Sequence, residues 1–307
     1  MNFIYRLVNS IKTYGLFNSI KVFYLKFCRN NQFYVNFNLV HLKGLFILKI
    51  IPLFISPIFL FEKNKLIRTA MSFKASYPDK DPFVKFVKEI NEKKIENYEG
   101  SSLEKYYANF RPTTIYDLYP YTKKIINSKI FKLKAKYINH ILPWDETFYK
   151  KTLNEIIDEV DLQKNIMRKC QENNLKFDSN IYYGNQNFGP VHNEMGKLEF
   201  ERYKKVLNSI NKIGYKPDYK NNPHISGQIL KNKNSWMLLI SDGVHRATVL
   251  IALEFKKYPI SLKVLPKIID RNKVYSWPGV TRKYYTQEEA LIIFDSIFES
   301  NNNFEII

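Results

Sequence analysis

The stretch that decides the fold runs from Leu198 to Val264, and its centre reads Ile240-Ser241-Asp242-Gly243-Val244-His245-Arg246-Ala247. The apolar run that leads into this centre, Trp236–Ile240, has the length and composition of a strand. An Asp-Gly pair, which is typical of a tight turn, follows the run. Apolar residues then recur with helical spacing at Ala247, Leu250, Ile251 and Phe255. The order of these signals predicts a strand, a turn and a helix.

This pattern places two polar residues, His245 and Arg246, in the first turn of the helix. Unpaired backbone N–H groups and the positive end of the helix dipole meet at such a helix start. A guanidinium beside them can give two hydrogen bonds to a phosphate group. The sequence therefore predicts a phosphate- or nucleotide-binding site at Asp242, Gly243, His245 and Arg246.

Each of these residues also has a simpler structural interpretation. Arg246 would otherwise be an ordinary arginine on a helix surface. His245 either serves as an acid or base, or hydrogen-bonds the neighbouring strand from a buried position. Gly243 allows close approach of a ligand, or only a turn. For Asp242, capping of the helix through its side-chain oxygen is preferred over orienting His245 or binding a metal.

Carboxylates that could act as a catalytic base lie in the preceding segment. Residues 184–196 are predicted to form a glycine- and asparagine-containing loop that includes His192 and Glu194. If the loop folds over the helix start, Glu194, Glu199 or Glu201 could take a proton from a substrate hydroxyl. We name Glu194 and His245 as the catalytic candidates, although solvated charges are the simpler interpretation. The five histidines lack the spacing of metal ligands, so no metal site is predicted.

Charge is distributed unevenly along the 307 residues, which carry a formal net charge of +19. The residues before Asp79 include eleven lysines and arginines but one acid, Glu62. Contact of residues 1–75 with an anionic membrane surface would explain this excess, and so would a general bias in composition. Nucleic acid is a less favoured partner because no DNA-recognition helix is evident.

The chain composition favours a folded cytoplasmic protein. Hydrophobic residues make up 45% of the chain, and the two cysteines lie far apart. Residues 3–27 predict amphipathic helices. Residues 45–61 are strongly apolar but contain two prolines, which predicts short buried strands or a shallow membrane-docking hairpin rather than a span. A peripheral position at the inner membrane is therefore the alternative location.

Several further helices have recognisable starts. Asp81-Pro82 predicts an N-cap and a first-turn proline for a helix that runs to Glu96. Ser101 or Ser102 starts the next helix, and a capping box, Thr286-Gln287-Glu288-Glu289, starts the last. We divide the chain into a basic apolar region (1–75), a mostly helical region (76–175), the domain around the central stretch (176–270) and a C-terminal loop and helix (271–307).

The central stretch resembles a known superfamily. Asp242–Arg246 is similar to the G-x-H-R box of the ParB/sulfiredoxin-like superfamily, and the flanking segments agree in order at Leu207–Gly214, His224–Leu230 and Tyr258–Val264. The resemblance covers about 70 residues. It implies an α+β fold, with a ParB/sulfiredoxin-like small mixed sheet and packed helices in the C-terminal part. A helix-rich N-terminal region with short strands would complete the chain.

The superfamily includes DNA-partitioning CTPases, sulfinic-acid reductases and small-molecule kinases, so the resemblance is weaker for function than for fold. Val244 stands where the reductases need a cysteine, which excludes sulfinate reduction. Glu254 stands near the helix end where relatives usually have glycine.

Three outer segments carry a narrower resemblance. Tyr98–Tyr107, Phe188–Val191 and Trp277–Val280 look like parts of bacterial proteins that contain this domain and tend to be encoded with surface-polysaccharide biosynthesis enzymes. Together the resemblances imply a kinase-like phosphotransferase on a small hydroxylated or sugar substrate. Its cofactor would be a nucleoside triphosphate or diphosphate with Mg²⁺. The alternatives are a ParB-like DNA-binding protein and a non-catalytic membrane-associated adaptor.

Overall fold

The computed structural model describes three short strands by their backbone, at residues 34–36, 58–62 and 66–68. It describes the rest of the fold at residues 81–113, 142–146, 150–152, 154–155, 162–181, 183–216, 225–262 and 268–298. The predicted helices of residues 3–27 lie outside these ranges. Of the apolar stretch at residues 45–61, predicted as short buried strands or a membrane-docking hairpin, only the backbone of a strand beginning at Ile58 is described.

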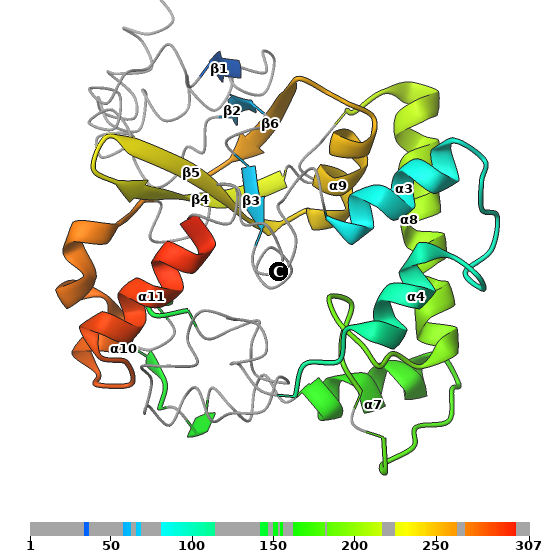
Figure 1. Ribbon diagram of the computed structural model, residues 1–307, viewed down its shortest axis with the longest axis horizontal. Coiled ribbons are helices and arrows are strands. Elements are labelled where there is room, and N and C mark those ends of the chain that lie inside the picture. Colours follow the sequence, from blue (N-terminus) through cyan, green and yellow to red (C-terminus); the bar gives the residue numbers. More distant parts are fainter. Residues whose placement is uncertain are drawn as a thin grey trace, which may run out of the picture.

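A mixed sheet organises the described residues (Figure 1). Its strands run in the order β1-β2-β6-β4-β5-β3, and β7 also pairs with β4. Their bounds are β1 Tyr34–Asn36, β2 Ile58–Glu62, β3 Leu66–Arg68, β4 Ile225–Asn232, β5 Ser235–Asp242, β6 Lys257–Ser261 and β7 Ile268–Asp270. The pairs β4–β5 and β2–β6 are antiparallel, and the other pairs are parallel. The three strands predicted around the central stretch, now β4, β5 and β6, are confirmed.

Helices surround this sheet. Their bounds are α3 Pro82–Asn91, α4 Ser102–Asn109, α7 Leu162–Glu172, α8 Asn193–Ile213, α9 Val244–Ala252, the 3-10 helix η7 Arg271–Ser276, α10 Pro278–Thr281 and α11 Gln287–Phe298. The described part is therefore α+β, with a small mixed sheet and packed helices, as predicted. None of its helices is both long and apolar enough to cross a membrane.

The predicted helix starts are confirmed at atomic detail. Asp81 accepts hydrogen bonds from the first backbone N–H groups of α3, and Ser101 accepts one from Glu104 N at 3.1 Å at the start of α4. Thr286 Oγ1 accepts from Glu289 N at 3.1 Å, and Glu289 Oε2 accepts from Thr286 N at 2.8 Å, which is a reciprocal capping box. Local side-chain chemistry thus fixes where these helices begin.

Three boundary predictions are wrong. Helix α3 ends at Asn91 rather than Glu96. The loop predicted for residues 184–196 ends earlier, because α8 begins at Asn193 and is capped by the side chain of His192. The loop predicted after Asp270 is the 3-10 helix η7. A histidine cap is not among the usual capping residues, which explains why the start of α8 was misplaced.

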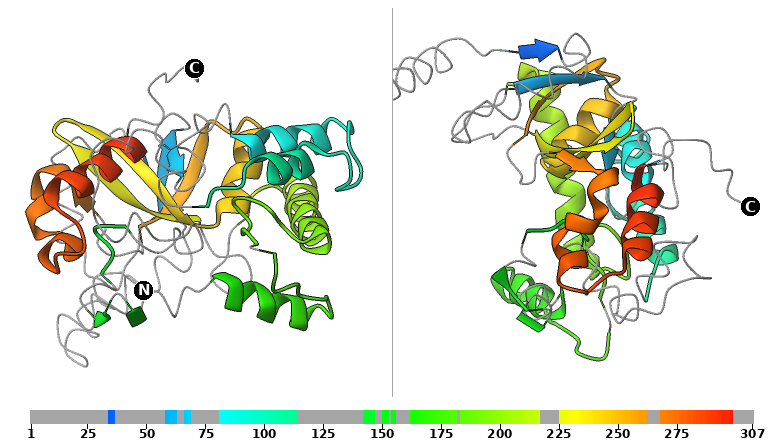
Figure 2. Two further views of the ribbon diagram at one scale, coloured as in Figure 1. Left: turned by 60° about the horizontal axis from the view of Figure 1, so that its bottom comes forward. Right: turned by 90° about the vertical axis from the view of Figure 1, so that its left-hand side faces the viewer.

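Two hydrophobic cores lie on opposite faces of the β4–β5 hairpin. Leu238 and Ile240 of β5 pack in the first core, with α3, α4, α8 and α9. The alternate residues Met237 and Leu239 pack in the second core, with η7 and α11. Figures 1 and 2 show the two helix groups at opposite ends of the hairpin.

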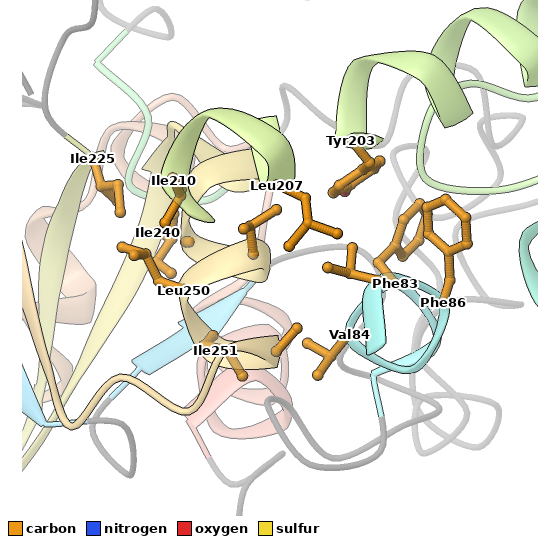
Figure 3. Packing of buried hydrophobic residues seen from close by; sticks show 14 of the residues in the cluster. Phe83, Val84, Phe86, Tyr203, Leu207, Ile210, Ile225, Ile240, Leu250 and Ile251 are labelled. Atoms are coloured by element: carbon orange, nitrogen blue, oxygen red, sulfur yellow. The ribbon is translucent and has the colours of Figure 1, made fainter. Parts of the chain in front are cut away.

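The first core joins segments that are far apart in sequence (Figure 3). Phe83 and Phe86 of α3 meet Tyr203 of α8, with ring centroids 5.8 and 5.6 Å from that of Tyr203. Leu250 and its neighbours on α9 complete the cluster. The predicted regions 76–175 and 176–270 therefore share one core among the described residues, and this packing fixes α8 against α9.

Candidate functional site

The junction between β5 and α9 brings the four predicted phosphate-binding residues together. Strand β5 ends at Asp242, Gly243 adopts a left-handed conformation with φ +74°, and α9 begins at Val244. A Cβ atom on Gly243 would lie 2.9 Å from Arg246 Nη2 and 3.0 Å from Ile225 Cα. The guanidinium of Arg246 therefore folds back over Gly243, at a position that only glycine fits without strain.

No side chain caps the start of α9. The predicted capping role of Asp242 is wrong, because its Oδ1 accepts a hydrogen bond from the adjacent Gly243 N at 2.6 Å instead. Asp242 is exposed at the end of β5, and the left-handed turn at Gly243 separates it from the first turn of α9. The positive end of this helix is thus not masked by its own N-cap side chain.

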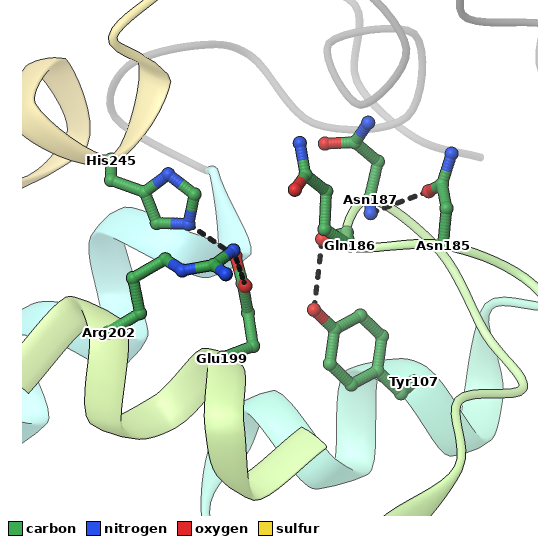
Figure 4. Close-up of polar contacts among 7 residues, drawn as sticks. All are labelled: Tyr107, Asn185, Gln186, Asn187, Glu199, Arg202 and His245. Carbon is green, nitrogen blue, oxygen red and sulfur yellow. Dashed lines mark hydrogen bonds and ion pairs between the residues drawn. The ribbon is translucent and has the colours of Figure 1, made fainter. Parts of the chain in front are cut away.

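A buried carboxylate holds the ring of His245 (Figure 4). Glu199 lies on α8, and its side chain is 8% exposed. Its Oε1 contacts His245 Nε2, and its Oε2 accepts a hydrogen bond from Arg202 Nη1 at 2.9 Å. The ring of Tyr203, one helical turn further along α8, packs on the imidazole with centroids 4.5 Å apart. The position of His245 is therefore set by α8 and not by its own helix alone.

This contact determines which ring nitrogen of neutral His245 carries the proton. A carboxylate only accepts hydrogen bonds, so Nε2 is the protonated nitrogen and Nδ1 has the lone pair. In Figure 4 the Nδ1 edge of the ring points away from Glu199. The ring can then take a proton at Nδ1, and the imidazolium would be stabilised by the Glu199 carboxylate.

The other acidic candidates lie elsewhere. Glu194 sits in the first turn of α8, where its Oε1 is 2.9 Å from Lys197 Nζ, and it makes no contact with His245. Glu201 faces Lys204 at 3.8 Å. Of the three glutamates considered from the sequence, the structure brings Glu199 to the histidine, while the named candidate Glu194 is half-exposed in a surface ion pair.

A sequence signal for Glu199 does exist. The buried stripe of α8 includes Phe200, Tyr203, Leu207 and Ile210, and Glu199 falls on the same face, four residues before Tyr203. An acid on the apolar stripe of a helix must have a partner, because a buried unpaired carboxylate is costly. The spacing indicates Arg202, three residues on, as one partner, but the second partner, His245, is on another helix and is not readable from spacing.

Tyr107, which no sequence pattern marked as functional, lies on the neighbouring helix α4. Tyr107 of α4 is 2% exposed, and its hydroxyl donates to Gln186 O at 2.9 Å. Burial, and next the charge of Glu199, raise the pKa of Tyr107 well above its usual value. Tyr107 therefore stays a neutral hydrogen-bond donor between Glu199 and the segment at Gln186.

The described residues contain no group of three or more His, Cys, Asp or Glu side chains that could hold a metal ion. Comparisons with protein-family models, with curated proteins and with solved structures found no match.

Proposed function

We propose that the protein is a phosphotransferase with a ParB/sulfiredoxin-like domain, which transfers phosphate from a nucleotide with Mg²⁺ to a small hydroxylated or sugar substrate. The observation that supports this most is a histidine held by a buried carboxylate, at an uncapped helix start, with a guanidinium beside it. The same three features are the ones that phosphoryl transfer needs: a proton acceptor, anion-binding N–H groups and a neutralising cation.

The phosphate side of the proposed reaction is the start of α9. Backbone N–H groups of the first turn point out of the helix there, and the helix dipole favours negative charge. Arg246 brings its guanidinium over Gly243, beside this helix start, where its charge would neutralise a phosphate. Mg²⁺ would enter with the nucleotide and neutralise charge on its phosphate groups.

The acceptor side is the Nδ1 edge of His245. The acceptor oxygen would form a bond to phosphorus while the bond from phosphorus to the leaving nucleotide breaks. The hydroxyl proton would pass to Nδ1, and Glu199 would hold the resulting imidazolium through Nε2–H. Arg202, which binds the other oxygen of Glu199, keeps that carboxylate oriented. Each proton and charge thus has a defined recipient.

The same proposal places the protein in surface-polysaccharide biosynthesis, in the cytoplasm where nucleotides are available. Its substrates are then the nucleotide and the hydroxylated acceptor. Residues 1–75, with their excess of basic side chains, would provide contact with the anionic surface of the inner membrane.

Thermal stabilisation by nucleotides tests the phosphate site directly. ATP, ADP, CTP and GTP, each with Mg²⁺, are added to the full chain and to Arg246→Ala and Arg168→Ala. Arg168 is an exposed arginine of α7 paired with Glu172, so its substitution is the matched control. A ligand at about 100 times its Kd stabilises the folded state by about 2.7 kcal/mol. We expect at least one nucleotide to raise the Tm of the wild type and of Arg168→Ala. The same nucleotide should leave the Tm of Arg246→Ala unchanged. Unchanged melting with all four nucleotides would overturn the proposal.

A further inference from the structure

Three consecutive carboxamide residues, Asn185, Gln186 and Asn187, lie on the Tyr107 side of the Glu199–His245 pair (Figure 4); we refer to them as the carboxamide loop. Their backbone is held by two phenols of α4. Tyr107 donates to Gln186 O at 2.9 Å, and Tyr106 donates to Asn187 O at 2.8 Å. Asn185 Oδ1 also accepts from Asn187 N at 2.7 Å. The loop backbone is therefore fixed from two directions.

The residues that follow anchor the loop more tightly. Phe188 is 1% exposed, and Gly189 N donates to Phe110 O at 2.8 Å. A Cβ on Gly189 would overlap the carbonyl oxygen of Tyr107 at 1.7 Å, so the loop backbone lies directly on the end of α4. In contrast, the side chain of Gln186 is exposed. The chain thus presents an exposed carboxamide on a rigid backbone.

Tyr107 links the loop to the histidine site. Its hydroxyl donates to the loop, and its helix α4 contacts α8, which carries Glu199. Figure 4 shows the carboxamide groups and the Nδ1 edge of His245 on the same side of Glu199 and Tyr107. A small molecule whose hydroxyl reaches Nδ1 would therefore have its other groups toward Gln186.

We propose that the carboxamide loop binds the hydroxyl groups of the acceptor, and that this acceptor is a neutral polyol such as a hexose. This inference rests on the proposed function and adds the acceptor subsite to it. A carboxamide offers both donors and an acceptor, and each sugar hydroxyl is also both a donor and an acceptor. A rigid loop loses little entropy when it makes such bonds.

The charges of the two sides support this assignment. The helix start carries Arg246 and the positive end of the α9 dipole, which suit phosphate. The described loop from Tyr183 to Val191 contains no charged side chain. An acceptor with a carboxylate or phosphate of its own would gain nothing from the loop, whereas a neutral polyol would gain hydrogen bonds. The site thus separates the charged donor from the neutral acceptor.

Saturation-transfer NMR on the full chain tests this subsite. The probes are glucose, N-acetylglucosamine and myo-inositol, and pyrophosphate with Mg²⁺ is titrated separately. Gln186→Ala removes the exposed carboxamide but keeps the backbone carbonyl that Tyr107 binds. Gln171→Ala, on the exposed surface of α7, is the matched control. We expect at least one sugar to give transfer signals that fall more than about threefold in Gln186→Ala, since one lost hydrogen bond corresponds to roughly that factor.

The two ligand classes distinguish failure of this inference from failure of the proposed function. If pyrophosphate binds and depends on Arg246, but no sugar gives a signal, the acceptor subsite is wrong and the phosphate site stands. If sugars bind and depend on Gln186 while pyrophosphate and nucleotides do not bind, the loop is a sugar site and the phosphotransferase is wrong. Sugar signals that are equal in Gln186→Ala and Gln171→Ala would overturn the subsite.

Discussion

The helices α9 and α11 begin in opposite ways. At the start of α11, Thr286 and Glu289 satisfy each other's backbone N–H groups, and Glu289 is 4% exposed. At the start of α9, Gly243 occupies the N-cap position and no side chain caps the helix. The chain has one buried glutamate beside each start, but Glu289 serves its own helix while Glu199 serves His245, 46 residues away.

Of these two helices, α9 is the one that lacks the stabilisation of a side-chain cap. Side-chain caps at α3, α4, α8 and α11 are built from residues within three positions of the helix start. At α9 the N-cap is a glycine, which has no side chain to accept from the first N–H groups, and the guanidinium of Arg246, which can only donate, folds back over it. A helix start left open in this way has a cost in stability, which ligand binding would offset.

The largest expected difference between the two helix starts is in catalysis. His245→Gln keeps a side chain that can hydrogen-bond Glu199 but removes the nitrogen that takes the proton. We expect kcat to fall by about 10²- to 10⁴-fold, the usual contribution of a general base. The measurement is steady-state consumption of nucleoside triphosphate with Mg²⁺ and a mixture of neutral sugars.

The control for this variant changes the other buried carboxylate. Glu289→Gln weakens the capping box of α11 and should lower the free energy of unfolding, while kcat stays unchanged. If His245→Gln turns over nucleotide as fast as the wild type, the assignment of His245 as the base is wrong.

A smaller effect, on stability and on phosphate affinity, is expected from adding a methyl group at Gly243. Gly243→Ala places a methyl group against Arg246 in a left-handed residue, which should cost about 1–2 kcal/mol of stability and displace the guanidinium. Gly100→Ala is the matched control, because Gly100 has φ +78° and open space around its Cβ position. We expect both variants to lose stability in chemical denaturation, but pyrophosphate affinity, measured by calorimetry, to fall in Gly243→Ala alone. Equal affinity in the two variants would show that Arg246 is not needed at this position.

At the capped start of α11, we expect a substitution to change stability alone. Thr286→Ala removes the cap of α11 and should lower the free energy of unfolding by about 1 kcal/mol. Because α11 packs in the second core, pyrophosphate affinity should not change. Urea denaturation and calorimetry on the same preparation measure both quantities. A drop in affinity would mean that the two helix starts are energetically coupled through the sheet.

Features that depend on neighbours in sequence were predicted well. Asp81, Ser101 and the box at Thr286 act within one helical turn, so their patterns carry the whole interaction. The strand–turn–helix around Gly243 was predicted for the same reason. His192 is the exception, since its ring nitrogen accepts from Glu194 N at 3.2 Å where an oxygen-bearing side chain is usual.

Features that depend on packing between distant segments were not predicted. Glu199 and His245 meet because the first core fixes α8 against α9, and no spacing in the sequence encodes that contact. Phe255 was placed on the buried stripe of α9, yet it is 37% exposed. The helix ends before it, as Phe255 N donates to Leu250 O at 3.0 Å across a left-handed residue, Glu254, with φ +59°.

Glu254 gives the smallest effect, at the other end of α9. This position lies where glycine is usual, because it must adopt positive φ at the end of the helix. Glu254→Gly should stabilise the fold by about 0.5 kcal/mol, as relief of left-handed strain outweighs both the added chain entropy and the exposed contact with Lys88 at 3.5 Å. Glu254→Ala loses the same contact and keeps the strain, so it should not stabilise. If Glu254→Gly and Glu254→Ala give equal free energies of unfolding in urea, the left-handed conformation at the end of α9 carries negligible strain.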